Sequence, residues 1–187
     1  NPYAYLLQTY FLNRRFAMIK EAMKNDNNIL DRSIYEDEIF MKMNTEMGNA
    51  TKVEYDIYKS LLNNMMEELP YAAHKKSPDL MITIKVSYET MINRIIKRGR
   101  DYEQIEKDPS LVDYYHRLLS HYDDWMDEYD ESPLLIIDGD KYDFVADVKD
   151  RVKILETIED KLYDLGNLEQ TKVDELRKAH LEILKQQ

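Results

Sequence analysis

Two charged side chains follow a short apolar run near the beginning of the chain. Ile29 and Leu30 fit a buried strand, and Asp31 and Arg32 come directly after them. Ser33 then opens a helical pattern as the expected N-cap of an S-x-x-E capping box. This order predicts a carboxylate and a guanidinium at the carboxyl end of a strand, where open α/β sheets bind their ligands. The alternative interpretation is an ordinary salt bridge on the surface.

Basic side chains gather at the end of a later helical segment. Arg94 and Arg98 lie one turn apart on the same helix face, and Gly99 lets the chain turn so that Arg100 can reach the same point. Forked, permanently charged guanidinium groups suit phosphate oxygens. Cations before a terminal glycine are also favoured by the helix dipole, so a purely structural role is the alternative. Glu103 adds an acceptor close by.

The elements that must position these groups alternate along the chain. Apolar periodicity predicts helices over 3–23, 33–47, 51–69, 87–98, 109–126 and 145–165. Near-continuous apolar runs predict strands over 80–86 and 134–137, in addition to 29–30. This alternation predicts an α/β domain with a parallel β-sheet flanked by helices. A polar joint then leads into a weakly amphipathic tail helix, expected to pack on the domain or on a partner chain.

The composition restricts the classes of function. The 187 residues carry a formal net charge of −11 and contain no cysteine. Thiol catalysis and disulfide bonds are excluded, and the charge argues against binding to nucleic acid or to an anionic membrane. No apolar run approaches the roughly 20 residues of a membrane span, and a cytoplasmic location is expected. The four glycines cannot form a Walker A loop, and His116 and His121 lack the spacing of a zinc-binding helix.

Four motifs, in order, give the chain a family resemblance. They are residues 7–12 (LQTYFL) together with Arg15, 30–37 (LDRSIYED), 94–104 (R-x-x-x-R-G-R-x-x-E-Q) and 137–141 (IDGDK). From residue 3 to residue 168 the sequence resembles the deoxynucleoside kinases, especially the bacterial deoxyadenosine and deoxyguanosine kinases. The resemblance implies a helix-rich, P-loop-kinase-like fold with three layers (α/β/α). The kinase domain would span 1–168, and 169–187 would form a C-terminal helical tail.

The resemblance also implies an activity. Members of this family transfer the γ-phosphoryl group of ATP, with Mg²⁺, to the 5′-hydroxyl of a deoxynucleoside, a reaction of nucleotide salvage. The expected substrate is deoxyadenosine or deoxyguanosine, and the expected assembly is a homodimer or a heterodimer with a sister subunit. The family's glycine-rich phosphate loop is expected to precede Asn1, and a chain without that loop is expected to be inactive.

The resemblance assigns a first group of side chains to the nucleoside and the reacting hydroxyl. Gln8 and Asp37 would hydrogen-bond to the base, and Arg15 would support Asp37. Asp31 would lie beside the metal, in direct contact or through a water molecule, or act as a base toward the 5′-hydroxyl. Arg32 would steady the phosphates and the substrate.

A second group is implied to act on the phosphates, the sugar and the ATP adenine. Glu103 would reach the 3′-hydroxyl of the sugar. A lid over the transferring phosphates would supply the electrostatic stabilisation that phosphoryl transfer requires. The lid residues would be Arg94, Arg98 and Arg100, and the residues that border the adenine would be Asp143 and Phe144.

Two other functions remain as alternatives. A kinase of the thymidylate kinase type shares the acid-arginine motif and the arginine lid but binds a nucleoside monophosphate. Glu103 argues against it, because a carboxylate suits a sugar hydroxyl better than a phosphate. A non-catalytic remnant that serves association is the other alternative, supported by the lack of a phosphate loop in the sequence. Met41 stands where relatives often carry a phenylalanine that stacks on the base, so a looser or differently shaped pocket is expected.

Overall fold

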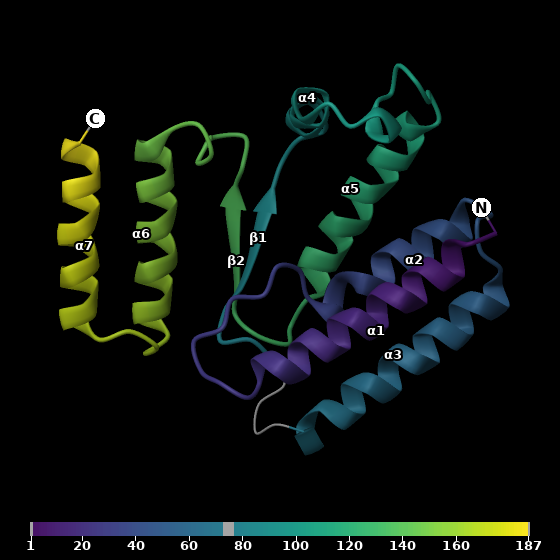
Figure 1. The fold of residues 1–187 in the computed structure, drawn as a ribbon, viewed down its shortest axis with the longest axis horizontal. Coiled ribbons are helices and arrows are strands. Elements are labelled where there is room, and N and C mark those ends of the chain that lie inside the picture. Colours follow the sequence, from purple (N-terminus) through teal and green to yellow (C-terminus); the bar gives the residue numbers. More distant parts are fainter. Residues whose placement is uncertain (1, 73–76, 187) are drawn as a thin grey trace. The chain divides into compact units, whose positions relative to one another are not determined.

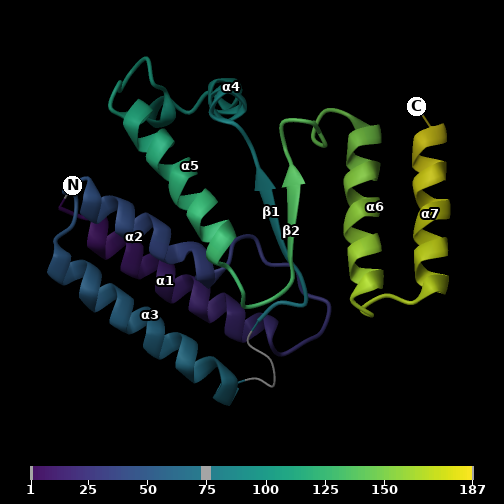
Figure 2. The ribbon, with the colours of Figure 1, turned by 180° about the vertical axis from the view of Figure 1, so that it is seen from behind.

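Helices dominate the structure, and the strands form one small sheet. The computed structural model describes residues 2–72 and 77–186, and Figures 1 and 2 show its ribbon from opposite sides. The chain divides into two compact units: a helical unit, Asn1–Ser77 with Pro109–Glu128, and a sheet unit, Pro78–Asp108 with Tyr129–Gln187. None of the helices within the described residues is long and apolar enough to cross a membrane.

The helical unit is built around one apolar core. Its helices are α1 (Ala4–Ala22), the 3-10 helix η1 (Ile34–Glu36), α2 (Asp37–Glu46), α3 (Lys52–Ala72) and α5 (Leu111–Glu128). The helices α1, α2 and α3 contact one another, and α5 packs against α2. The buried core consists of Leu12, Ile19, Ile34, Met41, Ala50, Tyr58 and Leu62. Leu12 and Ile19 lie seven residues apart on α1, and Tyr58 and Leu62 lie four apart on α3, which is the helical spacing expected of a buried face.

The sheet unit contains two parallel strands, β1 (Met81–Lys85) and β2 (Leu134–Asp138). Their arrows point the same way in Figures 1 and 2. Helix α4 (Tyr88–Arg98) and the 3-10 helix η2 (Asp101–Glu103) follow β1, and α6 (Val148–Asp164) and α7 (Gln170–Lys185) follow β2. The two strands predicted for this part of the chain, and an α/β fold with a parallel sheet, are thereby confirmed.

The segment before η1 differs from the predicted strand. Ile29 is 98% exposed and Leu30 is 42% exposed, and neither lies in a strand. A strand needs a neighbour to pair its backbone groups, and the sheet formed by the described residues consists of β1 and β2 alone. The prediction of a buried strand at 29–30 is therefore wrong. The capping box forms only in part: Glu36 accepts the backbone N–H of Ser33, but the Ser33 side chain makes no capping hydrogen bond.

Helix α4 begins and ends where the sequence signals place its ends. The Ser87 hydroxyl accepts the backbone N–H of Thr90 at 3.2 Å, so Ser87 is the N-cap. Gly99 follows the last turn with φ of 72°, a left-handed conformation that glycine adopts without steric cost. Ile95 is buried, whereas Arg94 and Arg98 lie on the exposed side of the helix. The apolar and basic sides of α4 are thus separated.

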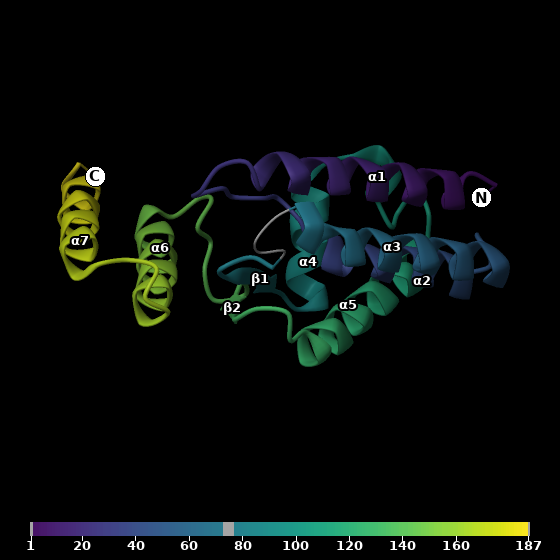
Figure 3. The ribbon, with the colours of Figure 1, turned by 90° about the horizontal axis from the view of Figure 1, so that it is seen from below.

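Helix α7 packs along α6 within the sheet unit, as the three ribbon views agree (Figures 1, 2 and 3). Arg177 of α7 forms ion pairs with Glu159 and Asp160 of α6. His180 Nε2 lies 3.4 Å from Glu159 Oε1, and both residues are buried. The apolar part of this contact is small, since Val173 is the only buried apolar side chain among the described residues of α7. Charged contacts therefore make up much of this helix pair.

Candidate active site

An ion pair between α1 and α2 fixes the carboxylate predicted to bind the base. Arg15 Nε donates to both carboxylate oxygens of Asp37, at 2.8 and 3.0 Å. Asp37 is only 4% exposed, and the Tyr58 hydroxyl donates to its backbone carbonyl at 3.3 Å. Burial raises the pKa of Asp37, and the Arg15 guanidinium offsets part of this rise. The structure thus brings together the two residues that the sequence analysis paired.

Gln8 lies two turns before Arg15 on α1 and is half-buried. Its side-chain amide has no hydrogen-bond partner among the described residues, so its donor and acceptor are available to a ligand. Arg15 also donates through Nη1 to the backbone carbonyl of Asp31, at 3.3 Å. One arginine therefore connects the base-binding carboxylate to the segment that carries Asp31.

Asp31 and Arg32 lie in the exposed turn before η1. Arg32 has a φ of 69°, a left-handed conformation that costs a residue with a Cβ about 1 kcal/mol or more. Its guanidinium lies over the ring of Phe40, 4.6 Å from the centroid, and its Nε is 3.8 Å from Glu36 Oε1. The Asp31 carboxylate has no ion-pair or hydrogen-bond partner within residues 2–72 and 77–186. Arg32 is restrained by two neighbours, whereas Asp31 is accessible.

Glu36 is a shielded acid that the sequence analysis used only as part of a helix cap. Its side chain is 12% exposed and lies next to Arg32. Burial raises the pKa of Glu36, while the guanidinium groups of Arg32 and Arg15 lower it by less. The i,i+4 spacing of Arg32 and Glu36 is the signal that could have revealed this pair.

Glu36→Gln is expected to make folding stability less sensitive to pH. Because the pKa of Glu36 is raised in the folded state, the wild type loses stability as pH rises through this folded-state pKa. Glutamine cannot ionise, so the variant should gain stability relative to the wild type as pH rises from about 4 to 7. Urea unfolding at several pH values measures this difference. A difference that stays constant over the range would contradict the prediction.

In the sheet unit, Glu103 joins two of the arginines predicted to form the lid. Arg98 Nε lies 3.1 Å from Glu103 Oε2, and Arg100 Nη1 lies 3.3 Å from Glu103 Oε1. The Glu103 side chain is 19% exposed, whereas both arginines are about half exposed. The turn at Gly99 and the short helix η2 bring these three side chains together. The two arginines predicted to bind phosphate are therefore neighbours of the carboxylate predicted to bind the sugar.

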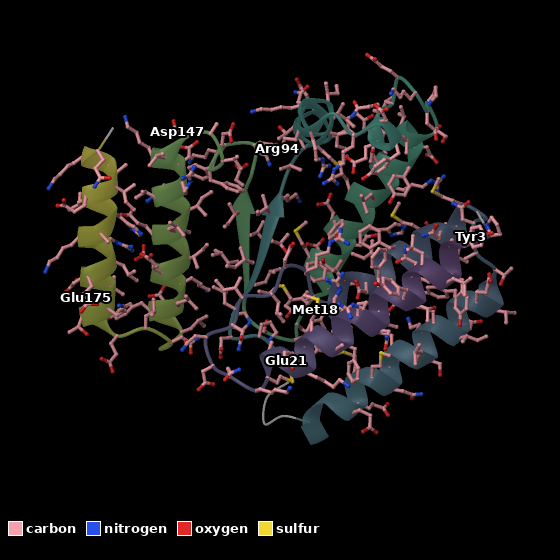
Figure 4. The ribbon with its side chains drawn as sticks, in the orientation of Figure 1. Tyr3, Met18, Glu21, Arg94, Asp147 and Glu175 are labelled. Atoms are coloured by element: carbon pink, nitrogen blue, oxygen red, sulfur yellow. The ribbon has the colours of Figure 1, made fainter. Side chains whose placement is uncertain are left out.

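Arg94 contacts a different part of the sheet unit. Its Nη2 donates to the backbone carbonyl of Gly139 at 2.6 Å. Figure 4 shows Arg94 beside the loop that follows β2. Although Arg94 and Arg98 share one helix face, Arg94 ties α4 to this loop and does not join Arg98 and Arg100 at Glu103. A role of Arg94 at the phosphates stays a prediction.

Asp143 and Phe144, predicted to border the adenine, lie in the loop between β2 and α6. Asp143 Oδ1 accepts the backbone N–H of Ala146 at 3.1 Å, and this hydrogen bond is the main cause that lowers the pKa of Asp143. The backbone carbonyl of Phe144 accepts from Arg151 Nε at 2.9 Å. The loop is therefore held in shape by its own hydrogen bonds.

Asp140, part of the motif 137–141, ties the ends of the two strands together. Both of its carboxylate oxygens accept the backbone N–H of Ser87, at 3.0 Å. Hydrogen bonds from the Thr90 side chain and from Ser87 lower the pKa of Asp140. At the neighbouring Gly139, a Cβ would lie 2.7 Å from a methyl carbon of Val86. Glycine is therefore required at this junction.

The acidic residues do not form a cage for a metal ion. Within residues 2–72 and 77–186 there is no cluster of three or more His, Asp or Glu side chains that could hold one. Mg²⁺ is commonly bound by one or two protein carboxylates, while substrate phosphates and water supply the other oxygens. The accessible Asp31 carboxylate fits this mode of binding.

The fold belongs to a known class of phosphotransferase. The profile of the family described as deoxynucleoside kinase matches residues 1–163, and the chain belongs to this family. It is 56% identical over 166 residues to a deoxyguanosine kinase from Lactobacillus acidophilus, with 89% of this chain and 72% of that protein covered. It is 50% identical over 166 residues to a deoxyadenosine kinase from the same organism, with 89% and 77% covered. The family expected from the sequence is confirmed.

Solved structures share the fold. A deoxyadenosine kinase from M. mycoides with the products dCMP and a flexible dCDP bound has a TM-score of 0.64 and 30% identity, with 86% of this chain and 73% of that chain covered. The same enzyme with bound dATP gives a TM-score of 0.62 and 29% identity, with 86% and 81% covered. The expected α/β fold of the family is therefore confirmed.

Proposed function

We propose that this protein phosphorylates a purine deoxynucleoside at its 5′-hydroxyl, with ATP as the phosphate donor. The observation that carries the proposal is the identity of 56% and 50% to a deoxyguanosine kinase and a deoxyadenosine kinase. The Gln8 amide and the Asp37 carboxylate, held by Arg15, offer donors and acceptors that suit a purine edge. We propose that this activity serves nucleotide salvage in the cytoplasm, in keeping with the cysteine-free sequence.

Asp31 and Arg32 would act on the reacting groups. The Asp31 carboxylate would accept the proton of the 5′-hydroxyl or hold Mg²⁺, directly or through water. Either task needs an accessible carboxylate without a competing cation, which describes Asp31 among the described residues. Bound Mg²⁺ would neutralise charge on the phosphate oxygens during transfer. Arg32 would donate to the phosphates, where a fixed guanidinium stabilises the developing charge.

The sheet unit would supply the lid and the contact to the sugar. Glu103 pairs with Arg98 and Arg100 in this structure. We propose that the 3′-hydroxyl replaces one of these contacts when nucleoside binds, which would release a guanidinium for the transferring phosphates. We propose that Arg94 contributes to the lid over the phosphates. The adenine of ATP would be bordered by Asp143 and the ring of Phe144.

The test is a substrate panel with the full-length protein. Deoxyadenosine, deoxyguanosine, deoxycytidine, thymidine and their 5′-monophosphates are each offered with ATP and Mg²⁺, and ADP release is followed. We expect kcat/KM for a purine deoxynucleoside to exceed that for the pyrimidines by roughly tenfold or more. A preference for a nucleoside monophosphate would favour a thymidylate-kinase-type enzyme. Absence of both ATP binding and phosphoryl transfer would favour an association module.

We also propose a homodimer formed through α1 and α3. Exposed apolar side chains line α1, with exposed fractions from 44% to 68%: Tyr3, Leu6, Leu7, Tyr10, Phe11 and Met18. Figure 4 shows Tyr3 and Met18 toward opposite ends of α1. On α3, Val53 and Ile57 are 67% and 51% exposed. Extended apolar surfaces of this kind are uncommon on monomers and favour association.

Ile57→Lys is expected to convert this dimer into a monomer, because a charge at the centre of an apolar contact loses its solvation. Light scattering during size-exclusion chromatography measures the mass of both proteins. Asn63→Lys, at an exposed position of the same helix away from the surface shared by Val53 and Ile57, is a control for added charge. A wild type that is monomeric alone but forms a dimer with a sister subunit would replace the homodimer by a heterodimer.

We further propose that the kinase domain spans residues 1–168 and that 169–187 form an added helical tail. The match to the family ends at residue 163, before α7 begins. The packing of α7 on α6 supports a tail that stays attached to its own chain.

A further inference from the structure

Arg32 rests on a series of aromatic side chains that the proposed function does not use. The ring of Phe40 in α2 lies under its guanidinium, 4.6 Å from Cζ to the ring centroid. Phe40 meets Tyr122 of α5 at 6.3 Å and an interplanar angle of 78°, and Tyr122 meets Trp125 at 6.4 Å and 77°. Such edge-to-face pairs are favourable beyond the burial of their area. These contacts lie within the helical unit and connect α5 to Arg32.

The same aromatic series holds the backbone next to Arg32. Trp125 Nε1–H donates to the backbone carbonyl of Tyr35 at 3.0 Å. Tyr35 lies in η1, between Arg32 and the base-binding Asp37 in the sequence. The aromatic contacts therefore restrain both the guanidinium and the backbone of the segment that carries it.

An exposed arginine needs such restraint if it is to act on a phosphate. The Arg32 side chain is 47% exposed and its backbone is in the left-handed region. A long, free side chain loses rotamer entropy when a ligand fixes it, and prior positioning removes part of this cost. A guanidinium held over an aromatic face by a cation–π contact does not use its N–H donors in that contact, so they stay available to an acceptor.

We propose that Phe40, supported by Tyr122 and Trp125, is a positioning residue that holds the Arg32 guanidinium ready to donate to the transferring phosphates. This inference rests on the proposed kinase function and adds a determinant of its rate. Phe40 acts through Arg32 and not on the substrate. Glu36, 3.8 Å from Arg32 Nε, restrains the guanidinium from a second direction.

The test compares three variants of the full-length protein. Phe40→Leu removes the aromatic face, Phe40→Tyr keeps it, and Phe16→Leu is the matched control. Phe16 packs against the core of the same unit and lies under a different cation, with Lys20 Nζ 4.9 Å from its centroid. We expect Phe40→Leu to lower kcat about 5- to 20-fold with the nucleoside KM changed less than about twofold. Phe40→Tyr and Phe16→Leu should keep kcat within about twofold of the wild type.

A second comparison separates positioning from general loosening of the fold. In the Arg32→Lys variant, the contact between residue 32 and the Phe40 ring is already altered. Adding Phe40→Leu to this variant should therefore lower kcat by at most about twofold more. An equal fractional loss in both backgrounds would overturn the inference, as would a kcat loss shared with Phe16→Leu. The Arg32 Nε–H resonance should also shift in Phe40→Leu, and an unchanged resonance counts against the proposal. An inactive wild type overturns the proposed function itself, whereas an active wild type with undiminished Phe40→Leu overturns only this role.

Discussion

Asp31→Asn is expected to lower kcat by about 100- to 10,000-fold, the usual effect of losing a group that takes the proton from the nucleophile. A comparable loss is expected if the carboxylate holds Mg²⁺ at the phosphates. Within the described residues the Asp31 carboxylate has no partner, so its replacement breaks no contact of the fold. The free energy of unfolding should change by less than about 0.5 kcal/mol. Steady-state kinetics and urea unfolding measure the two effects.

Asp26→Asn is the matched control, because Asp26 is an exposed aspartate in the turn before Asp31. It should leave both kcat and stability unchanged. The dependence of Asp31→Asn on Mg²⁺ distinguishes the two roles: partial recovery at high Mg²⁺ indicates a metal contact, and no recovery indicates a base. Activity of Asp31→Asn within tenfold of the wild type would contradict both roles.

Arg15→Met is expected to lower the free energy of unfolding by about 3–5 kcal/mol, because it leaves the buried Asp37 carboxylate without its partner. The nucleoside KM should rise as well, since Arg15 orients both oxygens of that carboxylate. The loss of stability should be smaller at low pH, where Asp37 takes up a proton; burial already raises the pKa of Asp37. Urea unfolding and nucleoside kinetics check the prediction.

Arg14→Met supplies the matched control for Arg15→Met. Arg14 is the adjacent arginine on α1 and is exposed, so its replacement should change stability by less than about 0.5 kcal/mol. The double variant Arg15→Met with Asp37→Asn removes both charges and should recover much of the lost stability. It should not recover nucleoside binding. A single variant as stable as Arg14→Met would show that the ion pair does not contribute as described.

Local signals in the sequence correctly predicted both ends of α4 and the two strands of the sheet. Ser87 and Gly99 act within one helical turn, and each β-branched run specifies its own extended backbone. The prediction of a strand at Ile29 and Leu30 was wrong because a strand depends on a partner elsewhere in the chain and not on local signals alone. Two apolar residues cannot specify a strand without a neighbouring strand to pair with, and a sequence pattern does not show whether one is present.

The candidate site depended more on contacts between distant residues. The partner of Arg94 is a carbonyl 45 positions away, and Trp125 reaches a carbonyl 90 positions away. Helical spacing gave the correct face for Arg94 but not its hydrogen-bond acceptor. Met41 is fully buried in the core of the helical unit, while the neighbouring Phe40 faces Arg32. Which of two adjacent side chains enters a core is decided by packing, which periodicity alone does not resolve.

Charged contacts between α6 and α7 favour the observed alignment of the two helices. Apolar side chains can slide past one another by a turn at little cost, but the ion pairs of Arg177 with Glu159 and Asp160 would be broken by such a shift. A shift of one turn would separate Glu159 from both Arg177 and His180 and leave a buried carboxylate uncompensated. The charges therefore favour the observed position of α7 along α6 over others that the small apolar contact between the two helices would tolerate.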